Sequence, residues 1–213
     1  MLKETNIAFI TFEGGEGTGK TTLIERLMVD LEISGYKAIK TREPGGSKIS
    51  EQIRNVILSV NNVEMDYMTE ALLYAASRRQ HLEEVIKPNL KKGNIVICDR
   101  YVDSSLAYQG YARGLGIERV YKINDYAIDG FYPDLTIYID VAPEIGLGRI
   151  KKNNRDMDRL DREQISFHEK VREGYLEVSK MFPDRIKVVD GNDTLDNIYE
   201  EIKKIVFDSI KEE

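Results

Sequence analysis

Short stretches with strand-like composition alternate with amphipathic stretches along most of the chain. Apolar and β-branched residues gather at 7–12, 94–98, 135–141 and 185–189, and a further strand is predicted at 36–41. Nearly continuous apolar runs of this length are typical of strands that are buried on both faces. The pattern therefore predicts five strands in one parallel sheet.

The segments between these strands have helical spacing. Leu23, Leu27 and Leu31 recur at every fourth position, which places them on one face of a helix. Further helices are predicted at 65–87, ended by Pro88, near 116–130, at 143–151, at 161–181, and from about residue 194. Strands that alternate with helices predict right-handed crossovers and a doubly wound α/β fold, in which ligands bind beyond the carboxyl ends of the strands.

Composition narrows the classes of protein. The 213 residues suit a single domain, and a net charge of −6 gives no general attraction to nucleic acid or anionic membranes. No apolar run approaches a membrane span, and the first residues lead directly into a strand, so we expect no membrane partner and no signal peptide. The single cysteine, Cys98, lies in an apolar strand and favours a buried thiol in a cytoplasmic protein.

The first strand is followed by a glycine-rich loop that matches G-x-x-x-x-G-K-[ST]. The loop consists of Gly14, Gly15, Glu16, Gly17, Thr18, Gly19, Lys20 and Thr21. The backbone N–H groups of such a loop surround the phosphates of a nucleotide, and a helix follows at once. Lys20 is expected to reach the β- and γ-phosphates and Thr21 to bind Mg²⁺, which predicts ATP or GTP as a ligand.

The end of the third strand carries further candidates. Asp99 ends the third strand, where a carboxylate commonly holds magnesium beside a phosphate loop. Arg100 follows it, and a guanidinium at this position favours a second anionic reactant, because its planar fork pairs with phosphate. Two strands therefore supply complementary halves of one phosphate-transfer site.

Several motifs together resemble those of thymidylate kinases. They are Phe-Glu-Gly-x-Glu-Gly-x-Gly-Lys-Thr at 12–21, Arg-Glu-Pro-Gly-Gly at 42–46, Ser-Arg-Arg-Gln-His at 77–81, Asp-Arg-Tyr-x-x-Ser-Ser-x-Ala-Tyr-Gln-Gly at 99–110, Tyr-Pro-Asp-Leu-Thr at 132–136, and two more at 158–161 and 167–175. The resemblance implies a five-stranded nucleoside-monophosphate-kinase fold with a small lid at about 149–160. It also implies transfer of the γ-phosphoryl group of ATP to dTMP, with Mg²⁺, by a homodimer.

The resemblance assigns acceptor-binding roles to residues of several elements. Arg54 and Arg100 resemble the clamp on the dTMP phosphate, and Glu43-Pro44 resembles the family's tight turn with a cis peptide. Tyr74 stands where an aromatic ring stacks on thymine, and Arg78 lies four residues further on the same helix face. The remaining expected contacts with the base and the deoxyribose are Ser105, Tyr108 and Gln109.

The resemblance also locates the charge that acts on the transferred phosphoryl group. In one branch of the family an arginine in the phosphate loop supplies it, whereas this chain has Gly17 there. We therefore expect the charge to come from the lid, with Arg155 as the catalytic arginine and Arg159 as a possible second donor. Arg149 is expected to stack on adenine, and Glu16 to accept a hydrogen bond from the substrate 3′-hydroxyl.

Other functions remain open at this point. A GTPase switch is disfavoured because the chain has no Asn-Lys-x-Asp motif. A kinase acting on UMP or on a deoxynucleoside, and a nucleotide-binding module without turnover, are the alternatives to a dTMP kinase. Intact Lys20, Thr21, Asp99 and Arg100 favour an enzyme over a binding module.

Overall fold

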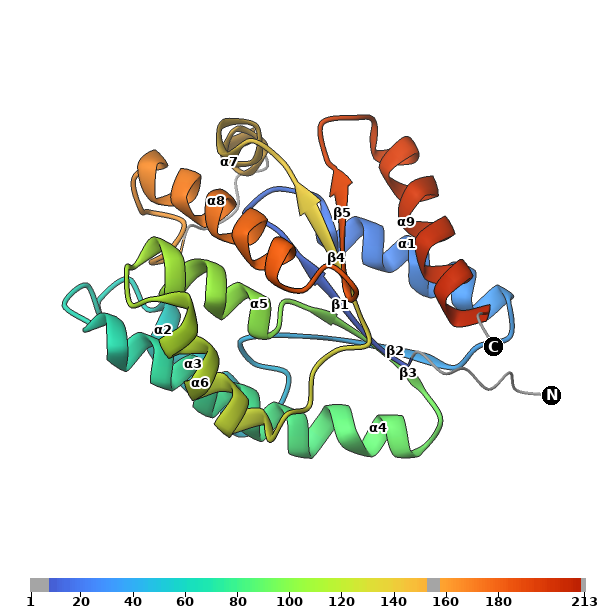
Figure 1. Cartoon of the computed structure of the whole chain (residues 1–213), viewed down its shortest axis with the longest axis horizontal. Coiled ribbons are helices and arrows are strands. Elements are labelled where there is room, and N and C mark those ends of the chain that lie inside the picture. The colour runs from blue at the N-terminus through green and yellow to red at the C-terminus, as the bar shows by residue number, and fades with distance from the viewer. Residues whose placement is uncertain (1–7, 153–157, 212–213) are drawn as a thin grey trace.

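A computed structural model describes residues 8–152 and 158–211 (Figure 1). Its sheet has five parallel strands in the order β2-β3-β1-β4-β5. Their bounds are Phe9–Glu13 (β1), Ala38–Arg42 (β2), Ile95–Asp99 (β3), Leu135–Asp140 (β4) and Ile186–Asp190 (β5). The predicted parallel α/β sheet is confirmed, and each strand lies within two residues of its predicted start.

Helices cover both faces of this sheet (Figure 1). They are α1 (Lys20–Ile33), α2 (Lys48–Leu58), α3 (Tyr67–His81), α4 (Lys87–Lys91), α5 (Val102–Ser105), α6 (Ile117–Ile128), α7 (Pro143–Lys152), α8 (Ile165–Met181) and α9 (Leu195–Lys211), with π-helical segments η1 (Leu82–Ile86) and η2 (Leu106–Ala112). Helices α1 and α9 form a core with one face, whereas α2, α3, α6 and α8 lie over the other.

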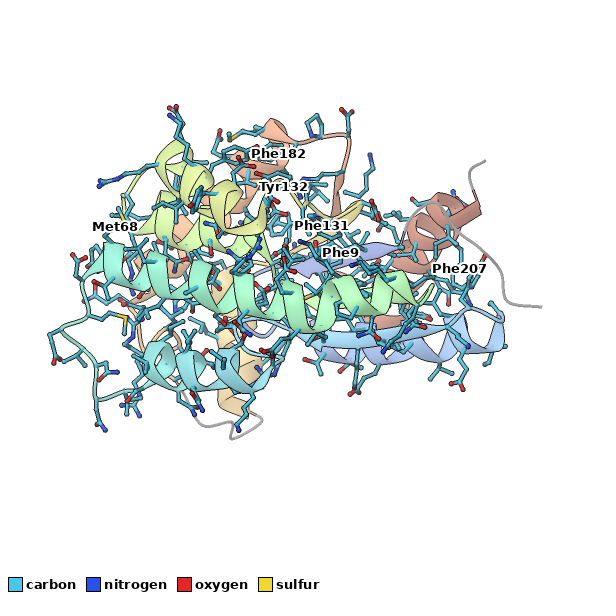
Figure 2. All side chains as sticks on the ribbon, turned by 90° about the horizontal axis from the view of Figure 1, so that it is seen from below. Phe9, Met68, Phe131, Tyr132, Phe182 and Phe207 are labelled. Carbon is cyan, nitrogen blue, oxygen red and sulfur yellow. The ribbon has the colours of Figure 1, made fainter. Side chains whose placement is uncertain are left out.

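Two sequence predictions about helices need correction. Pro88 does not end the helix predicted at 65–87. Instead, α3, η1 and α4 form one continuous helical rod that reaches Lys91, as Figure 2 shows. At the wide turn of η1, the Lys87 N–H donates to the Leu82 carbonyl, five residues earlier. Pro88 then stands in the first turn of α4, where a missing N–H is tolerated.

The helical segments α2 and α5–η2 were not predicted, and α8 begins at Ile165 rather than near 161.

Aromatic rings pack between the sheet and the segments that cover the face on which α6 and α8 lie. Phe9 of β1 packs against Tyr101 and Phe131, with ring centroids 5.0 and 6.1 Å apart (Figure 2). Tyr121 stacks on Tyr132 and Phe182 at 5.8 and 5.9 Å. These contacts fix the layer that carries α6 and the end of α8 against the sheet.

No helix among the described residues has both the length and the hydropathy needed to cross a bilayer.

Helix α8 packs against η2 at a glycine. A Cβ added at Gly174 would lie 2.8 Å from Tyr111 Cβ and 3.0 Å from the Ala107 carbonyl oxygen. Both distances are shorter than ordinary van der Waals contact, so the two segments approach closely only because position 174 has no side chain. The next residue, Tyr175, is thereby brought to the carboxyl edge of the sheet.

We predict that Gly174→Ala lowers the free energy of unfolding by about 1–3 kcal/mol, because the added methyl group forces α8 and η2 apart. Gly148→Ala is the matched control: nothing lies within 4 Å of its added Cβ, so the same change should be neutral or slightly stabilising. Urea unfolding of both variants measures the difference, and equal stabilities would contradict the packing analysis.

Candidate functional site

The carboxyl ends of the strands surround a cavity of about 740 Å³. Phosphate-loop residues 16–22 line one part of it. Of the other predicted site residues, the cavity is lined by Glu43, Arg54, Tyr74, Asp99, Arg100, Tyr108, Gln109 and Arg149. The structure therefore brings residues from both predicted halves of the site to one pocket, at the edge of the sheet where parallel α/β folds bind ligands.

Lys20 begins α1 and folds back over the phosphate loop. Its Nζ donates hydrogen bonds to the carbonyl oxygens of Gly14 and Gly15, at 3.0 and 2.9 Å, and to Thr18 Oγ1 at 3.2 Å. Burial, followed by the charge of Arg100, lowers the pKa of Lys20 to about 8. The ammonium group thus lies within the loop, where the oxygens of a polyphosphate would replace the carbonyl groups as its partners.

Arg100 adopts a left-handed backbone conformation directly after β3, with φ of 69°. Its guanidinium group donates to the Gly14 carbonyl at 2.8 Å and to the Tyr175 hydroxyl at 3.0 Å. It also forms an ion pair with Glu16 Oε1 at 2.5 Å. A non-glycine residue in this conformation requires support from its surroundings, and such residues cluster at functional sites.

Glu16 therefore contacts Arg100 and faces the cavity. The Tyr108 hydroxyl also donates to Glu16 Oε1, at 3.3 Å. A carboxylate among phosphate-binding groups is thus neutralised by the arginine next to it. The predicted bond from Glu16 to a substrate hydroxyl stays a prediction.

Glu13, at the end of β1, is a buried carboxyl group that the sequence analysis missed. Its Oε1 accepts the Tyr101 N–H at 2.7 Å, and its Oε2 accepts the hydroxyl groups of Ser104 and Tyr175 at 2.5 and 2.9 Å. Burial, followed by the charge of Asp103, raises the pKa of Glu13 to about 7. A glutamate that ends a strand with both faces buried was the signal that could have identified it.

The part of the cavity that is predicted to bind the acceptor is built on the loop after β2. The peptide bond between Glu43 and Pro44 is cis, as predicted. The Pro44 carbonyl accepts a hydrogen bond from Arg54 Nη1 at 2.8 Å, which holds this guanidinium at the cavity wall. Burial and the nearby charge of Arg42 lower the pKa of Arg54. Unfavourable burial beside another cation is relieved when an anion binds, as a phosphate would here.

Arg78 and Ser105 lie beneath this wall rather than on it. Arg78 is 1% exposed, and its Nε donates to Glu43 Oε2 at 2.7 Å. Its Nη1 donates to Ser105 Oγ at 3.1 Å and to Asn124 Oδ1, and its Nη2 donates to the Tyr101 carbonyl at 2.8 Å. The structure thus joins Arg78, Ser105 and Glu43 in one network, and their predicted contacts with the substrate stay predictions.

Arg159 is not among the residues that line the cavity. It is buried, its Nε donates to the Ile57 carbonyl at 2.9 Å, and its Nη2 pairs with Glu70. Arg159 is therefore held by the protein itself, and its expected role as a second donor to the phosphoryl group stays a prediction. Its guanidinium instead pairs with the buried Glu70 carboxylate, which lies 89 residues away along the chain.

One oxygen of Asp99 is buried without a hydrogen-bond partner among the described residues. It lies beside the phosphate loop, where Thr21 also lines the cavity. No group of three or more His, Cys, Asp or Glu side chains among these residues could hold a metal by itself. A carboxylate oxygen and a hydroxyl group suit Mg²⁺, which takes its remaining ligands from water and phosphates.

The cavity wall also includes residues that are not predicted as site residues. Asp193, Leu195 and Ile198, from the loop after β5 and the start of α9, line it. Arg149 Nη1 donates to the Gly17 carbonyl at 3.4 Å, so this side chain reaches the phosphate loop. For Leu195 and Ile198 the sequence predicts only a helix from about residue 194. Arg155 lies outside the described residues.

Comparison with known proteins identifies the family. The thymidylate kinase family matches residues 12–202. The chain is 57% identical to a thymidylate kinase of Clostridium novyi over 197 residues, which are 92% of this chain and 96% of that protein. It is 55% identical to a thymidylate kinase of a Geobacillus species over 204 residues, 95% of this chain and 97% of that protein. The chain belongs to the thymidylate kinase family.

A solved structure supports this placement in the family. The crystal structure of thymidylate kinase from Ehrlichia chaffeensis matches with a TM-score of 0.75 and 33% identity, over 93% of this chain and 97% of that one. The match covers nearly the whole chain, so the parallel sheet and its helices are the fold of the thymidylate kinase family. The predicted nucleoside-monophosphate-kinase architecture is confirmed.

Titration of Glu13 should be visible in the stability of this thymidylate kinase family member. Because its pKa in the folded state, about 7, exceeds its ordinary value of 4.5, the folded state binds more protons between these pH values. The resulting stability is fully present below pH 4.5 and is lost as the pH rises through 7. We predict that deprotonation of Glu13 lowers the free energy of unfolding by up to about 3 kcal/mol as the pH rises from 4.5 to 8.

Glu13→Gln should remove that pH dependence, because an amide retains an acceptor for the Tyr101 N–H and carries no charge. Urea unfolding at pH 5 and pH 8 measures the change in both proteins. Glu25→Gln, at a side chain that is 56% exposed, is the control and should behave as the unsubstituted protein. A parallel pH dependence in the Glu13 variant would show that another group titrates.

Proposed function

We propose that the protein transfers the γ-phosphoryl group of ATP to dTMP, giving ADP and dTDP. The observation that supports this proposal best is the single cavity in which the phosphate loop meets Arg54, Tyr74 and Arg100. A loop for one polyphosphate and arginines for a second anion are the two requirements of a nucleotide kinase. Membership of the thymidylate kinase family supports dTMP as the acceptor.

The reaction is an in-line displacement at phosphorus. An oxygen of the dTMP phosphate forms a bond to the γ-phosphorus, and the bond from this phosphorus to the β,γ-bridging oxygen breaks, with its electron pair leaving on ADP. The attacking phosphate is already ionised at neutral pH, so the protein needs no general base. Catalysis then consists of positioning and neutralising charge, for which Lys20 and Arg100 are placed at the phosphate loop.

Arg100 and Arg54 would hold the acceptor phosphate from two sides. Both guanidinium groups line the cavity, and carbonyl oxygens of Gly14 and Pro44 hold them in place. Tyr74 and Tyr108 line the same cavity and present aromatic surface to the base and the sugar. These contacts would orient the acceptor before the transfer begins.

Thr21 and Asp99 would hold Mg²⁺. The buried, unpaired Asp99 oxygen beside the loop supports this assignment. When bound, the ion would neutralise charge on the β- and γ-phosphate oxygens.

Residues 1–213 would form one catalytic domain, with a lid at about 149–160. Arg149 at the start of this segment reaches the Gly17 carbonyl, which connects the root of the lid to the phosphate loop. A lid that closes over both nucleotides would exclude water and prevent loss of ATP to hydrolysis. Arg155 is the proposed source of positive charge for the transferred phosphoryl group.

The decisive experiment follows ADP formation from Mg-ATP with dTMP, dUMP, UMP, CMP or thymidine as the acceptor. We expect turnover with dTMP at the highest kcat/KM, and negligible ADP without an acceptor. Lys20→Ala should reduce kcat/KM by at least about a hundredfold, because it removes a charged contact with the transferred phosphate. Turnover without an acceptor, or a clear preference for UMP, would contradict the proposal.

Arg54→Gln tests the acceptor clamp. We predict that the KM for dTMP rises about tenfold to a hundredfold, because a charge-assisted hydrogen bond to phosphate is lost. The KM for ATP should change little, since Arg54 lies outside the phosphate loop. Arg79→Gln on α3, at a side chain that is 46% exposed, is the control and should leave both constants unaltered. Equal increases in both KM values would contradict a specific role in binding dTMP.

We also propose that the protein is a homodimer, on family grounds and because apolar side chains are exposed on α2, α3 and α6. Val56, Leu72 and Tyr126 are 47%, 51% and 91% exposed. Burying such side chains against a second copy is favourable. Sedimentation should give twice the chain mass for the unsubstituted protein and a lower mass for Leu72→Asp.

A cytoplasmic location is proposed as well. Cys98 is a buried thiol without a disulfide, and burial raises its pKa well above the ordinary range. A buried thiol with a raised pKa is unreactive. A free cysteine and the absence of a disulfide among the described residues are typical of proteins in a reducing compartment.

A further inference from the structure

Gln109 of η2 lines the cavity while its amide nitrogen is bound by the protein. Its Nε2 donates to Glu70 Oε1 at 2.8 Å, and the residue is 1% exposed. Among the described residues, the structure shows no hydrogen bond to the side-chain oxygen of Gln109. A glutamine in the cavity wall is thus held at its donor end and open at its acceptor end.

Glu70 is held in place by two arginines. It is completely buried, and its carboxylate pairs with Arg159 Nη2 and, at 3.4 Å, with Arg113 Nε. A carboxylate between two guanidinium groups offers only acceptors. If the Gln109 amide were reversed, its oxygen would face the oxygens of Glu70 without a proton between them, which is unfavourable in a buried site. Glu70 therefore determines which end of the amide faces the cavity.

We propose that Glu70 is a positioning residue that fixes the Gln109 amide with its oxygen toward the base of the acceptor, and so selects thymine or uracil over cytosine. N3 of thymine and uracil carries a hydrogen that an amide oxygen accepts, whereas N3 of cytosine is itself an acceptor. Cytosine would therefore leave two acceptors opposed in the pocket. The inference rests on the proposed function, because it requires that the base of the acceptor lies in this cavity.

The test compares kcat/KM for dTMP, dUMP and dCMP in Glu70→Gln and Glu70→Asp. In Glu70→Gln, the residue at 70 can donate as well as accept, so the Gln109 amide is free to reverse. Glu70→Asp retains a carboxylate for the two arginines, which favours folding, but is one methylene too short to reach Gln109. We expect the dTMP-to-dCMP ratio of kcat/KM to fall about tenfold to a hundredfold in both variants.

The dTMP-to-dUMP ratio should stay the same in these variants, because both bases carry the N3 hydrogen. A general loosening of the pocket would alter this ratio as well, so it separates positioning from a structural role. Glu163→Gln is the matched control: Glu163 pairs with Arg113 at 2.7 Å, so this change removes a charge from the same network without touching Gln109. It should leave both ratios unaltered.

A double-mutant cycle tests whether Glu70 acts through Gln109. Gln109→Leu removes the amide and should lower the dTMP-to-dCMP ratio by itself. Adding Glu70→Asp to Gln109→Leu should then change the ratio no further. Additive effects of the two substitutions would overturn this inference and leave the proposed function intact. Folded Glu70 variants that keep the original dTMP-to-dCMP ratio of kcat/KM would do the same. Unsubstituted protein that does not phosphorylate dTMP would refute the proposed function and, with it, this inference.

Discussion

The position of Arg100 is the constraint on which the rest of the site depends. Its backbone is left-handed, a conformation that costs about 1–3 kcal/mol for a residue with a side chain. Glu13 compensates from two directions, because it binds the N–H of the next residue, Tyr101, and the Tyr175 hydroxyl that also contacts the guanidinium. Since β1 and β3 are neighbours in the sheet, with Phe12 paired to Asp99, the two carboxyl ends deliver these groups to one place.

Buried charges in this acidic chain are neutralised locally. Glu43 pairs with Arg78 and contacts His81, and Asp103 pairs with both terminal nitrogens of Arg185 at 2.6 and 2.7 Å. Each such pair is costly to break, because removal of one partner leaves the other charged and desolvated. Substitution of Arg78 would therefore affect folding as well as binding, whereas Arg54, which is only partly buried, separates the two effects more cleanly.

The sequence predicted most of the fold and a set of candidate phosphate-binding residues that line one cavity, because both depend on local patterns. Five short strands, the glycine loop and the Asp99-Arg100 pair are each readable within a few residues. The hydrogen-bond partners of Glu13 and Arg159 were not predictable in this way, since Tyr101 and Glu70 lie 88 and 89 residues away from them along the chain. The prediction that Pro88 ends a helix was wrong because the π-helical turn η1 directly precedes it and allows the rod to continue into α4. This turn has no clear signal in the sequence.

The contact between the phosphate loop and α7 limits how this enzyme can change. A Cβ at Gly17 would overlap the carbonyl oxygen of Gly146, and a Cβ at Gly146 would overlap the carbonyl oxygen of Glu16. The backbones of the phosphate loop and α7 are in direct contact there. The space that a side chain at position 17 would need is therefore filled by the backbone of α7. An arginine could enter the loop at this position only if the backbone of α7 moved away first. A side chain at position 17 would thus require coordinated changes in two separate stretches of the gene, and a change in the loop alone would leave the two backbones poorly packed.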